Sequence, residues 1–132
     1  MRGAAVNLDG VLNVFEAAHT QDLRFVVYAS SAGVYGPDDG AVPRPTTHYG
    51  AFKLACEGAA RAYWLERGIA SVGLRPFVAY GPGRETGMSA GPTLACRAAA
   101  RGEPYTIPFT GSAGFVFADD VARAIETALA TT

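Results

Sequence analysis

The amino-acid sequence predicts an α/β fold with a parallel sheet, in which apolar strands alternate with helices. The main indication is the run Arg-Phe-Val-Val-Tyr-Ala at residues 24–29, which is apolar without alternation, as a strand buried on both faces of a sheet would be. A second short strand, at residues 71–74, leads into a loop rich in proline and glycine. The predicted order is helix, strand, helix, strand, helix, short strand, helix.

The first two elements are a helix and the apolar strand. The helix is expected over about residues 8–18, with Asn7 or Asp9 available as its N-cap. The strand is expected to end at Ser31. Residues 37–45 are rich in glycine, proline and aspartate, which are typical of turns, and they predict a surface loop.

The longest helix is expected to begin near Thr46 or Thr47 and to end at Gly68. Glycine readily adopts the left-handed conformation that closes a helix, so Gly68 predicts a C-terminal cap. The chain then turns into the strand at residues 71–74.

Two further helices complete the chain. Pro92 fits the first turn of a helix, and Gly102 is expected to end that helix. Asp119 or Asp120 is expected to cap a last helix that runs through Leu129.

Composition indicates one hydrophobic core. The chain has 132 residues, 49% of them hydrophobic, and is too short for two ordinary domains. Its 11 basic and 12 acidic residues leave a net charge of -1, so neither a nucleic-acid partner nor a membrane partner is expected. No signal peptide or long apolar stretch is visible, which favours the cytoplasm. Cys56 and Cys96 fit no zinc or redox spacing, so they are expected to be small buried thiols and no metal site is expected.

Lys53 is the only lysine beside ten arginines, and it follows Tyr49 by four residues. On a helix these two side chains lie on one face and can reach the same ligand. An ammonium beside a phenol favours the ionised phenol, and as a compact charge it can donate to a ribose hydroxyl where a guanidinium fits poorly. By itself the pattern Tyr-x-x-x-Lys is short and occurs on many surface helices.

Ser30 and Ser31 follow the apolar strand directly. Ligands of open α/β sheets bind at the carboxyl ends of the strands, so these hydroxyls are expected where chemistry takes place. The alternative is that they only end the strand and cap the next turn. Residues 70–84 repeat the design of a short strand followed by a loop rich in proline and glycine.

Together these segments resemble the extended short-chain dehydrogenase/reductase family, and within it the NAD-dependent epimerase/dehydratase branch. The resemblance begins with the helix at residues 7–18 and covers nearly the whole chain. It rests on Ser30 to Gly36, Tyr49 with Lys53, residues 74–77 with 80–84, and residues 117–122.

The resemblance implies part of a Rossmann-like, doubly wound parallel sheet, corresponding to the C-terminal half of such an enzyme. Residues 1–132 would form a single truncated NAD(P)-binding domain, with part of the substrate-binding region at about residues 78–115. The sequence contains no Gly-x-x-Gly-x-x-Gly loop, which in the family holds the dinucleotide phosphates at a helix N-terminus.

The resemblance also implies a catalytic triad of Ser31, Tyr49 and Lys53. Tyr49 would act as the base that takes a proton from a substrate hydroxyl, and Lys53 would support it and bind the nicotinamide ribose. Ser31 would hold the substrate oxygen.

The expected cofactor is NAD or NADP, and its binding by this chain alone is doubtful because the phosphate loop is absent from it. Besides Tyr49 and Lys53, the residues expected near the cofactor are Pro76, Phe77 and Asn7. Ser30, Ser31 and Arg84 are expected near a small-molecule substrate, a sugar or sugar derivative. Family members that bind sugar nucleotides often have asparagine where this chain has Val78, which weakens a nucleotide-sugar assignment.

Two functions remain open. The chain would be the catalytic half of an NAD(P)-dependent sugar or sugar-acid oxidoreductase or epimerase. Alternatively, it is an inactive truncated remnant, or a half that works only with a separate N-terminal chain. An unpaired strand edge would favour a homodimer or such a pairing.

Overall fold

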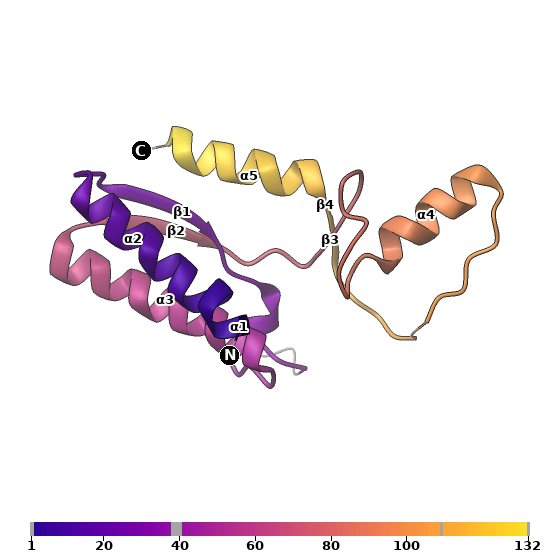
Figure 1. Cartoon of the computed structure of the whole chain (residues 1–132), viewed down its shortest axis with the longest axis horizontal. Coiled ribbons are helices and arrows are strands. Elements are labelled where there is room, and N and C mark those ends of the chain that lie inside the picture. The colour runs from indigo at the N-terminus through magenta and orange to yellow at the C-terminus, as the bar shows by residue number, and fades with distance from the viewer. Residues whose placement is uncertain (1, 38–40, 109, 132) are drawn as a thin grey trace. The chain divides into compact units, whose positions relative to one another are not determined.

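The structure is a computed structural model that describes residues 2–37, 41–108 and 110–131. It confirms the α/β class with parallel strand pairing (Figure 1). The chain divides into two compact units: Met1–Pro76 with Ile125–Thr132, and Phe77–Ala124. The expectation of one domain over residues 1–132 stays a prediction.

The sheet of the first unit consists of two parallel strands. β1 (Phe25–Ala29) pairs with β2 (Ala70–Leu74), with Phe25 opposite Ala70 and Ala29 opposite Leu74. β1 therefore ends at Ala29 and not at Ser31, because the chain leaves the extended ladder for a short 3-10 turn, η2 (Ala32–Val34).

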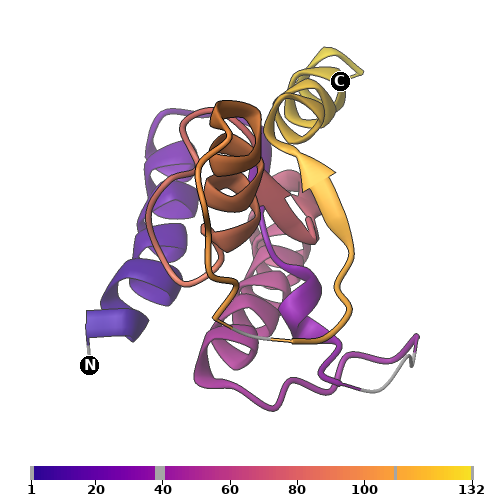
Figure 2. The same cartoon turned by 90° about the vertical axis from the view of Figure 1, so that its right-hand side faces the viewer.

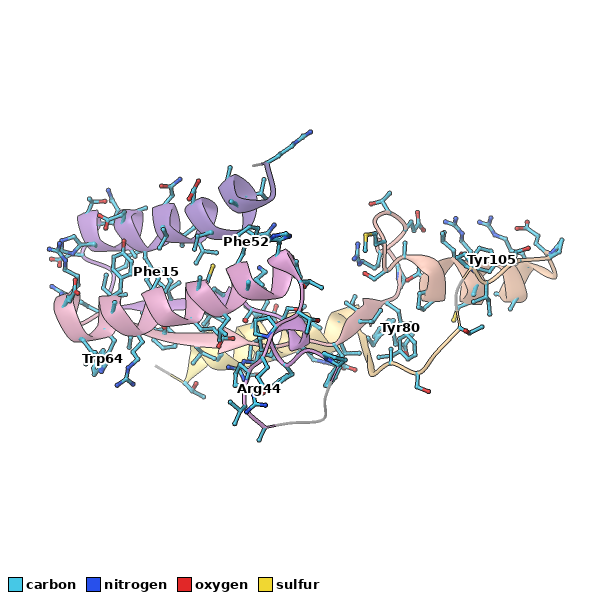
Figure 3. The ribbon with its side chains drawn as sticks, turned by 90° about the horizontal axis from the view of Figure 1, so that it is seen from below. Phe15, Arg44, Phe52, Trp64, Tyr80 and Tyr105 are labelled. Atoms are coloured by element: carbon cyan, nitrogen blue, oxygen red, sulfur yellow. The ribbon has the colours of Figure 1, made fainter. Side chains whose placement is uncertain are left out.

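Two helices cover one face of this sheet. α2 (Gly10–Thr20) packs on β1, α3 (His48–Arg67) packs on β2, and the helices contact each other (Figures 1 and 2). Phe15 of α2 is fully buried between the two helices and stacks on Tyr63 at 4.9 Å between ring centroids (Figure 3). The buried cluster also contains Ala18, Val26, Ala60 and Ile69.

The helix before β1 begins earlier than predicted. A short α1 (Arg2–Ala4) continues through a π-helical turn, η1 (Ala5–Asp9), into α2. Asn7 and Asp9 therefore lie inside helical turns and cap nothing, and Asp9 makes no side-chain cap hydrogen bond. Asn7 Nδ2 instead donates to the Gly3 carbonyl at 3.0 Å.

The predicted limits of the long helix are confirmed. Thr47 is the N-cap of α3, and its Oγ1 accepts a hydrogen bond from Gly50 N at 3.0 Å. Gly68 closes the helix in the left-handed conformation, with φ of 68°. The chain then enters β2 directly.

The second unit contains a strand that the sequence did not predict. β3 (Val78–Tyr80) pairs in parallel with β4 (Phe115–Phe117), and the Tyr80 ring packs on Phe117 at 5.6 Å between centroids. Three residues beside a turn carry too little periodicity to reveal a strand. α4 (Gly91–Arg101) has Pro92 in its first turn and ends at Gly102, both as predicted.

Three smaller expectations need correction or limits. The last helix, α5 (Ala118–Ala130), begins before Asp119 and Asp120, so both carboxylates lie in its first turn and not at its N-cap. Cys56 is buried as expected, but Cys96 is exposed because it lies on the outer face of α4. The loop predicted at residues 37–45 and the region 78–115 include residues 38–40 and 109, which lie outside the described residues.

Neither a membrane-spanning helix nor a metal site is found among the described residues. Within the described residues, no helix is long and apolar enough to cross a membrane. Over the same residues, no group of three or more His, Cys, Asp or Glu side chains is placed to hold a metal ion.

Gly50 allows α3 to approach the turn after β1. A Cβ at Gly50 would lie 2.3 Å from the Gly33 carbonyl oxygen and 2.9 Å from Pro45 Cβ. We therefore expect Gly50→Ala to lower the free energy of unfolding by about 1–3 kcal/mol, the usual cost of an overpacked core. Urea unfolding measures this change.

Gly58 on the same helix is the matched control, because nothing lies within 4 Å of a Cβ there. Gly58→Ala should stabilise the helix by about 0.5–1 kcal/mol. Equal effects of the two substitutions would show that the approach at Gly50 is unimportant.

β1 has an open edge in the structure. Within the described residues it pairs with β2 on one side and with no strand on the other. An open edge is a template for another strand, so we expect the isolated chain to associate with itself or with a partner. Light scattering that shows a monodisperse monomer, with slow amide exchange along Phe25–Ala29, would contradict this expectation.

Candidate active site

Two serines follow β1, and backbone hydrogen bonds hold them beside the end of β2. Ser30 N donates to the Leu74 carbonyl at 2.7 Å, and Ala32 N donates to the Pro76 carbonyl at 3.0 Å. Between these bonds, Ser31 caps the η2 turn: its Oγ accepts a hydrogen bond from Gly33 N at 3.1 Å. The Ser31 hydroxyl is therefore fixed at the carboxyl end of the strand.

The Tyr49 ring also lies beside Gly33. A Cβ at Gly33 would be 3.4 Å from Ser31 Oγ and 3.8 Å from Tyr49 Cδ1, so the hydroxyl and the ring lie near the same point. The capped first turn of α3 presents Tyr49 at this point, and the ring is 47% exposed. The structure thus brings Ser31 and Tyr49 together, although they are far apart in the sequence.

Lys53 lies one helical turn after Tyr49. Its Nζ donates to the Ala29 carbonyl at 2.8 Å and lies 5.7 Å from the Tyr49 ring centroid. The ammonium is thereby held at the last residue of β1. The three side chains of the predicted triad converge at the carboxyl end of one strand, where ligands of α/β sheets bind.

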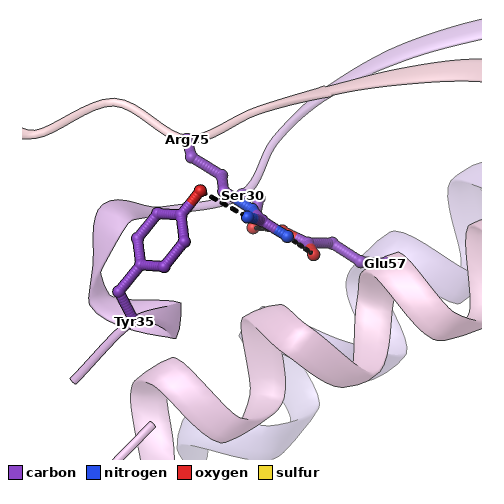
Figure 4. Close-up of polar contacts among 4 residues, drawn as sticks. All are labelled: Ser30, Tyr35, Glu57 and Arg75. Carbon is purple, nitrogen blue, oxygen red and sulfur yellow. Dashed lines mark hydrogen bonds and ion pairs between the residues drawn. The ribbon is translucent and has the colours of Figure 1, made fainter. Parts of the chain in front are cut away.

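Ser30 differs from Ser31, because it is buried and its hydroxyl is already engaged. Its Oγ donates to Glu57 Oε1 at 2.5 Å. Arg75 binds the same carboxylate through two bonds, Nε to Oε1 at 2.8 Å and Nη2 to Oε2 at 2.5 Å. Arg75 Nη1 also donates to the Tyr35 hydroxyl at 2.6 Å (Figure 4).

This cluster changes the ionisation of its members. The hydrogen bonds from Arg75 lower the pKa of Glu57 against the opposing effect of burial, and the bond from Ser30 lowers it further. The bonds to Glu57 raise the pKa of Arg75. Burial raises the pKa of the nearby Tyr28 to about 12. At neutral pH the cluster therefore contains a carboxylate paired with a guanidinium.

The residues expected near the cofactor occupy different positions. Asn7 lies in the π-helical turn, and its backbone carbonyl accepts a hydrogen bond from Cys56 Sγ at 3.0 Å. Pro76 presents its carbonyl to Ala32 N beside Ser31. Phe77 is the first residue of the second unit and is 61% exposed.

Arg84, expected near a substrate, binds its own loop in the second unit. Its Nη1 donates to the Thr86 carbonyl at 2.6 Å, and its Nη2 donates to Ser89 Oγ at 2.5 Å. The guanidinium therefore supports the turn after β3.

The sequence did not assign a role to Glu57, Arg75 or Tyr35. Glu57 continues the spacing of Tyr49 and Lys53 by another four residues, which was the available signal. A hollow of about 400 Å³ lies beside this cluster, lined by Tyr28, Glu57 and parts of α3 and β2, but it includes none of the triad residues.

Solved structures of known proteins share this fold. The chain superposes on the NAD complex of Thermus thermophilus UDP-glucose 4-epimerase with a TM-score of 0.80 and 30% identity, over 96% of this chain and 46% of that one. It also superposes on a GalE-like L-threonine dehydrogenase of Cupriavidus necator in its holo form, with a TM-score of 0.79 and 29% identity, over 91% and 42% of the two chains.

A curated relative is similar in sequence over a shorter stretch. An uncharacterized protein of Methanocaldococcus jannaschii is 40% identical over 79 residues, which are 54% of this chain and 24% of the relative. The chain therefore matches less than half the length of these relatives.

The parallel sheets and the solved structures that resemble them define a Rossmann-like α/β protein of the extended short-chain dehydrogenase/reductase type. The chain belongs to the NAD dependent epimerase/dehydratase family, whose sequence pattern matches residues 2–132.

The lowered pKa of Glu57 predicts a pH dependence of stability. A carboxyl group whose pKa is lower in the folded state stabilises the protein above its ordinary pKa of 4.5, and this stability is lost as the pH falls through the lower folded value. We therefore expect the free energy of unfolding to fall less steeply below pH 4.5 in Glu57→Gln than in the parent. Urea unfolding between neutral and acidic pH measures the slope.

Glu85 is the control, because it pairs with Arg97 at 2.8 Å while its side chain remains 47% exposed. Glu85→Gln should leave the acidic slope close to that of the parent. If Glu57→Gln retains the parent's slope, the Arg75 pair does not control acid stability.

Proposed function

We propose that this chain carries the catalytic residues of an NAD(P)-dependent oxidoreductase or epimerase that acts on a sugar or sugar acid. The observation that supports this proposal best is the convergence of Ser31, Tyr49 and Lys53 around the end of β1. Membership of the NAD dependent epimerase/dehydratase family supports the same reaction class.

The donor groups at this site fit the nicotinamide end of a dinucleotide. An ammonium has three N–H donors, and Ala29 accepts from one of them, so Lys53 can also donate to ribose hydroxyls. Tyr49 is close enough to face the same ligand. The sequence contains no glycine-rich loop of the form Gly-x-x-Gly-x-x-Gly for the phosphates, so this chain offers groups for one end of the cofactor.

The reaction would remove a proton from a substrate hydroxyl and a hydride from the carbon that carries this hydroxyl. The ionised Tyr49 oxygen takes the proton of the substrate hydroxyl, and the carbon–oxygen double bond forms as the hydride leaves the carbon. The nicotinamide, when bound, supplies the acceptor of that hydride. Ser31 donates a hydrogen bond to the substrate oxygen, and the Lys53 ammonium donates to the ribose hydroxyls. In the reductive direction Tyr49 returns the proton.

The alternative is that this chain is inactive alone, as a remnant or as a half that requires a separate N-terminal chain. The absence of a Gly-x-x-Gly-x-x-Gly loop from residues 1–132 supports weak cofactor binding by this chain alone. Cofactor affinity separates the two possibilities. Calorimetry of the isolated chain with NAD and NADP should show negligible binding if the phosphate loop governs affinity, and submicromolar binding would contradict this view.

Activity should appear when a dinucleotide-binding N-terminal segment of a relative is fused to this chain or expressed with it. In such an assembly Tyr49→Phe should lower dinucleotide-dependent turnover by at least about 10²-fold, because the general base is lost. With a panel of sugars, sugar acids and UDP-glucose, the measurement follows NAD reduction for a dehydrogenase and NAD-dependent formation of the epimer for an epimerase, which leaves no net reduced cofactor.

Tyr63→Phe is the control, because it removes a hydroxyl from the same helix that bonds only to Glu16 on α2. This variant should keep turnover near that of the parent. Near-parental turnover of Tyr49→Phe would exclude Tyr49 as the base. A folded assembly that turns over none of the panel would instead favour the inactive remnant.

A further inference from the structure

Arg75 is placed to control the surroundings of Lys53 without touching it. We propose that Arg75 is a positioning residue, which binds the Glu57 carboxylate and so keeps it from pairing with the Lys53 ammonium. The functional meaning of this proposal rests on the role of Lys53 proposed above, whereas the structural effect can be measured without it.

Lys53 and Glu57 are natural partners for an ion pair. They lie four residues apart on α3, on the face that also carries Tyr49, and opposite charges at this spacing attract each other. An ion pair with Glu57 would draw the ammonium along the helix, away from the Ala29 carbonyl and the Tyr49 ring. The Lys53 ammonium would then no longer lie at the end of β1.

The structure shows that Glu57 is bound elsewhere. Arg75 reaches both of its oxygens, at 2.8 Å and 2.5 Å, and Ser30 donates to one of them at 2.5 Å. Such a two-bond pair between a guanidinium and a carboxylate is stronger and more directional than a contact with an ammonium. Lys53 Nζ is correspondingly found on the Ala29 carbonyl, and among the described residues it forms no ion pair.

Tyr35 fixes the guanidinium in this position. Its hydroxyl accepts a hydrogen bond from Arg75 Nη1 at 2.6 Å, and the Arg75 Cζ atom lies 4.8 Å from its ring centroid. Tyr35 directly follows the η2 turn that Ser31 caps. Through Tyr35, the guanidinium that binds Glu57 is therefore linked to the η2 turn, which is capped by Ser31, the residue proposed to hold the substrate oxygen. Figure 4 shows Tyr35, Arg75, Glu57 and Ser30.

A purely structural role for the cluster makes a different prediction. If Arg75 only holds β2, α3 and η2 together, the Lys53 ammonium stays at the Ala29 carbonyl in Arg75→Met, whatever happens to the free energy of unfolding. If Arg75 acts by withholding Glu57, adding Glu57→Gln to Arg75→Met removes the competing charge and restores Lys53.

The single lysine makes the test direct. A chain labelled with ¹³Cε and ¹⁵Nζ lysine gives one side-chain NMR signal, that of Lys53. In Arg75→Met this signal should shift, because the ammonium moves to Glu57. In the double variant Arg75→Met with Glu57→Gln it should return to the position of the parent. A signal that does not shift in Arg75→Met, or does not return in the double variant, overturns the proposal.

Arg24→Met is the matched control, because it also removes an arginine that pairs with a carboxylate, Asp22 at 2.6 Å, on the exposed surface of the same unit. It should leave the Lys53 signal unchanged. If Arg75→Met does not fold, Arg75→Gln replaces it, because its neutral amide adds no second lysine signal and cannot neutralise the Glu57 carboxylate as the guanidinium does. The Lys53 signal should then shift in the same direction by less, and an unchanged signal contradicts the proposal.

In the assembled enzyme, turnover should fall in Arg75→Met and recover in the double variant, in parallel with the Lys53 signal. Arg75→Met should lose at least about tenfold in kcat, and the double variant should recover most of that loss. The NMR shift requires no activity, so an assembly without turnover contradicts the proposed function and leaves the positioning of Lys53 to be decided by the labelled chain.

Discussion

The candidate site depends on one close backbone contact, between α3 and the turn that follows β1. Gly50 has no Cβ, and the Gly33 carbonyl occupies the space that a Cβ would take. Because the helix can approach so closely, the Tyr49 ring and the Ser31 hydroxyl both lie within 4 Å of the position that a Cβ of Gly33 would take. Any residue larger than glycine would move the first turn of α3 outward, and with it Tyr49. The relative position of Ser31 and Tyr49 thus depends on the close packing of Gly33 against Gly50.

The parallel pairing of β1 and β2 also positions the residues that follow the two strands. Beyond the two strands, the backbone hydrogen bonds from Ser30 N to the Leu74 carbonyl and from Ala32 N to the Pro76 carbonyl still hold the two segments together. Arg75 lies between these two acceptors, so its side chain emerges beside Ser30 and meets Glu57. The pairing register of β1 and β2, and not a local motif, therefore places the Arg75 guanidinium beside Ser30 and Glu57.

Features encoded by neighbouring residues could be predicted from the sequence, whereas features set by tertiary contacts could not. The limits of α3 follow from Thr47 and Gly68, and the spacing of Tyr49 and Lys53 is enough to place them on one helical face. The π-helical turn that contains Asn7 was missed, because an extra residue in a turn leaves no clear change of hydrophobic period. The Glu57 cluster was missed because its members come from different elements.

Glu57 lies near Lys53, and removing its charge would affect the partly buried contacts that it makes with Ser30 and Arg75. Ser30 is buried, and without the carboxylate its hydroxyl would lose its acceptor. Arg75 would likewise lose the partner that holds its guanidinium between α3 and the η2 turn. The Glu57 carboxylate therefore serves Ser30 and Arg75 at a position from which it could also pair with Lys53. The Arg75 guanidinium binds both oxygens of this carboxylate, and the Lys53 ammonium remains at the end of β1.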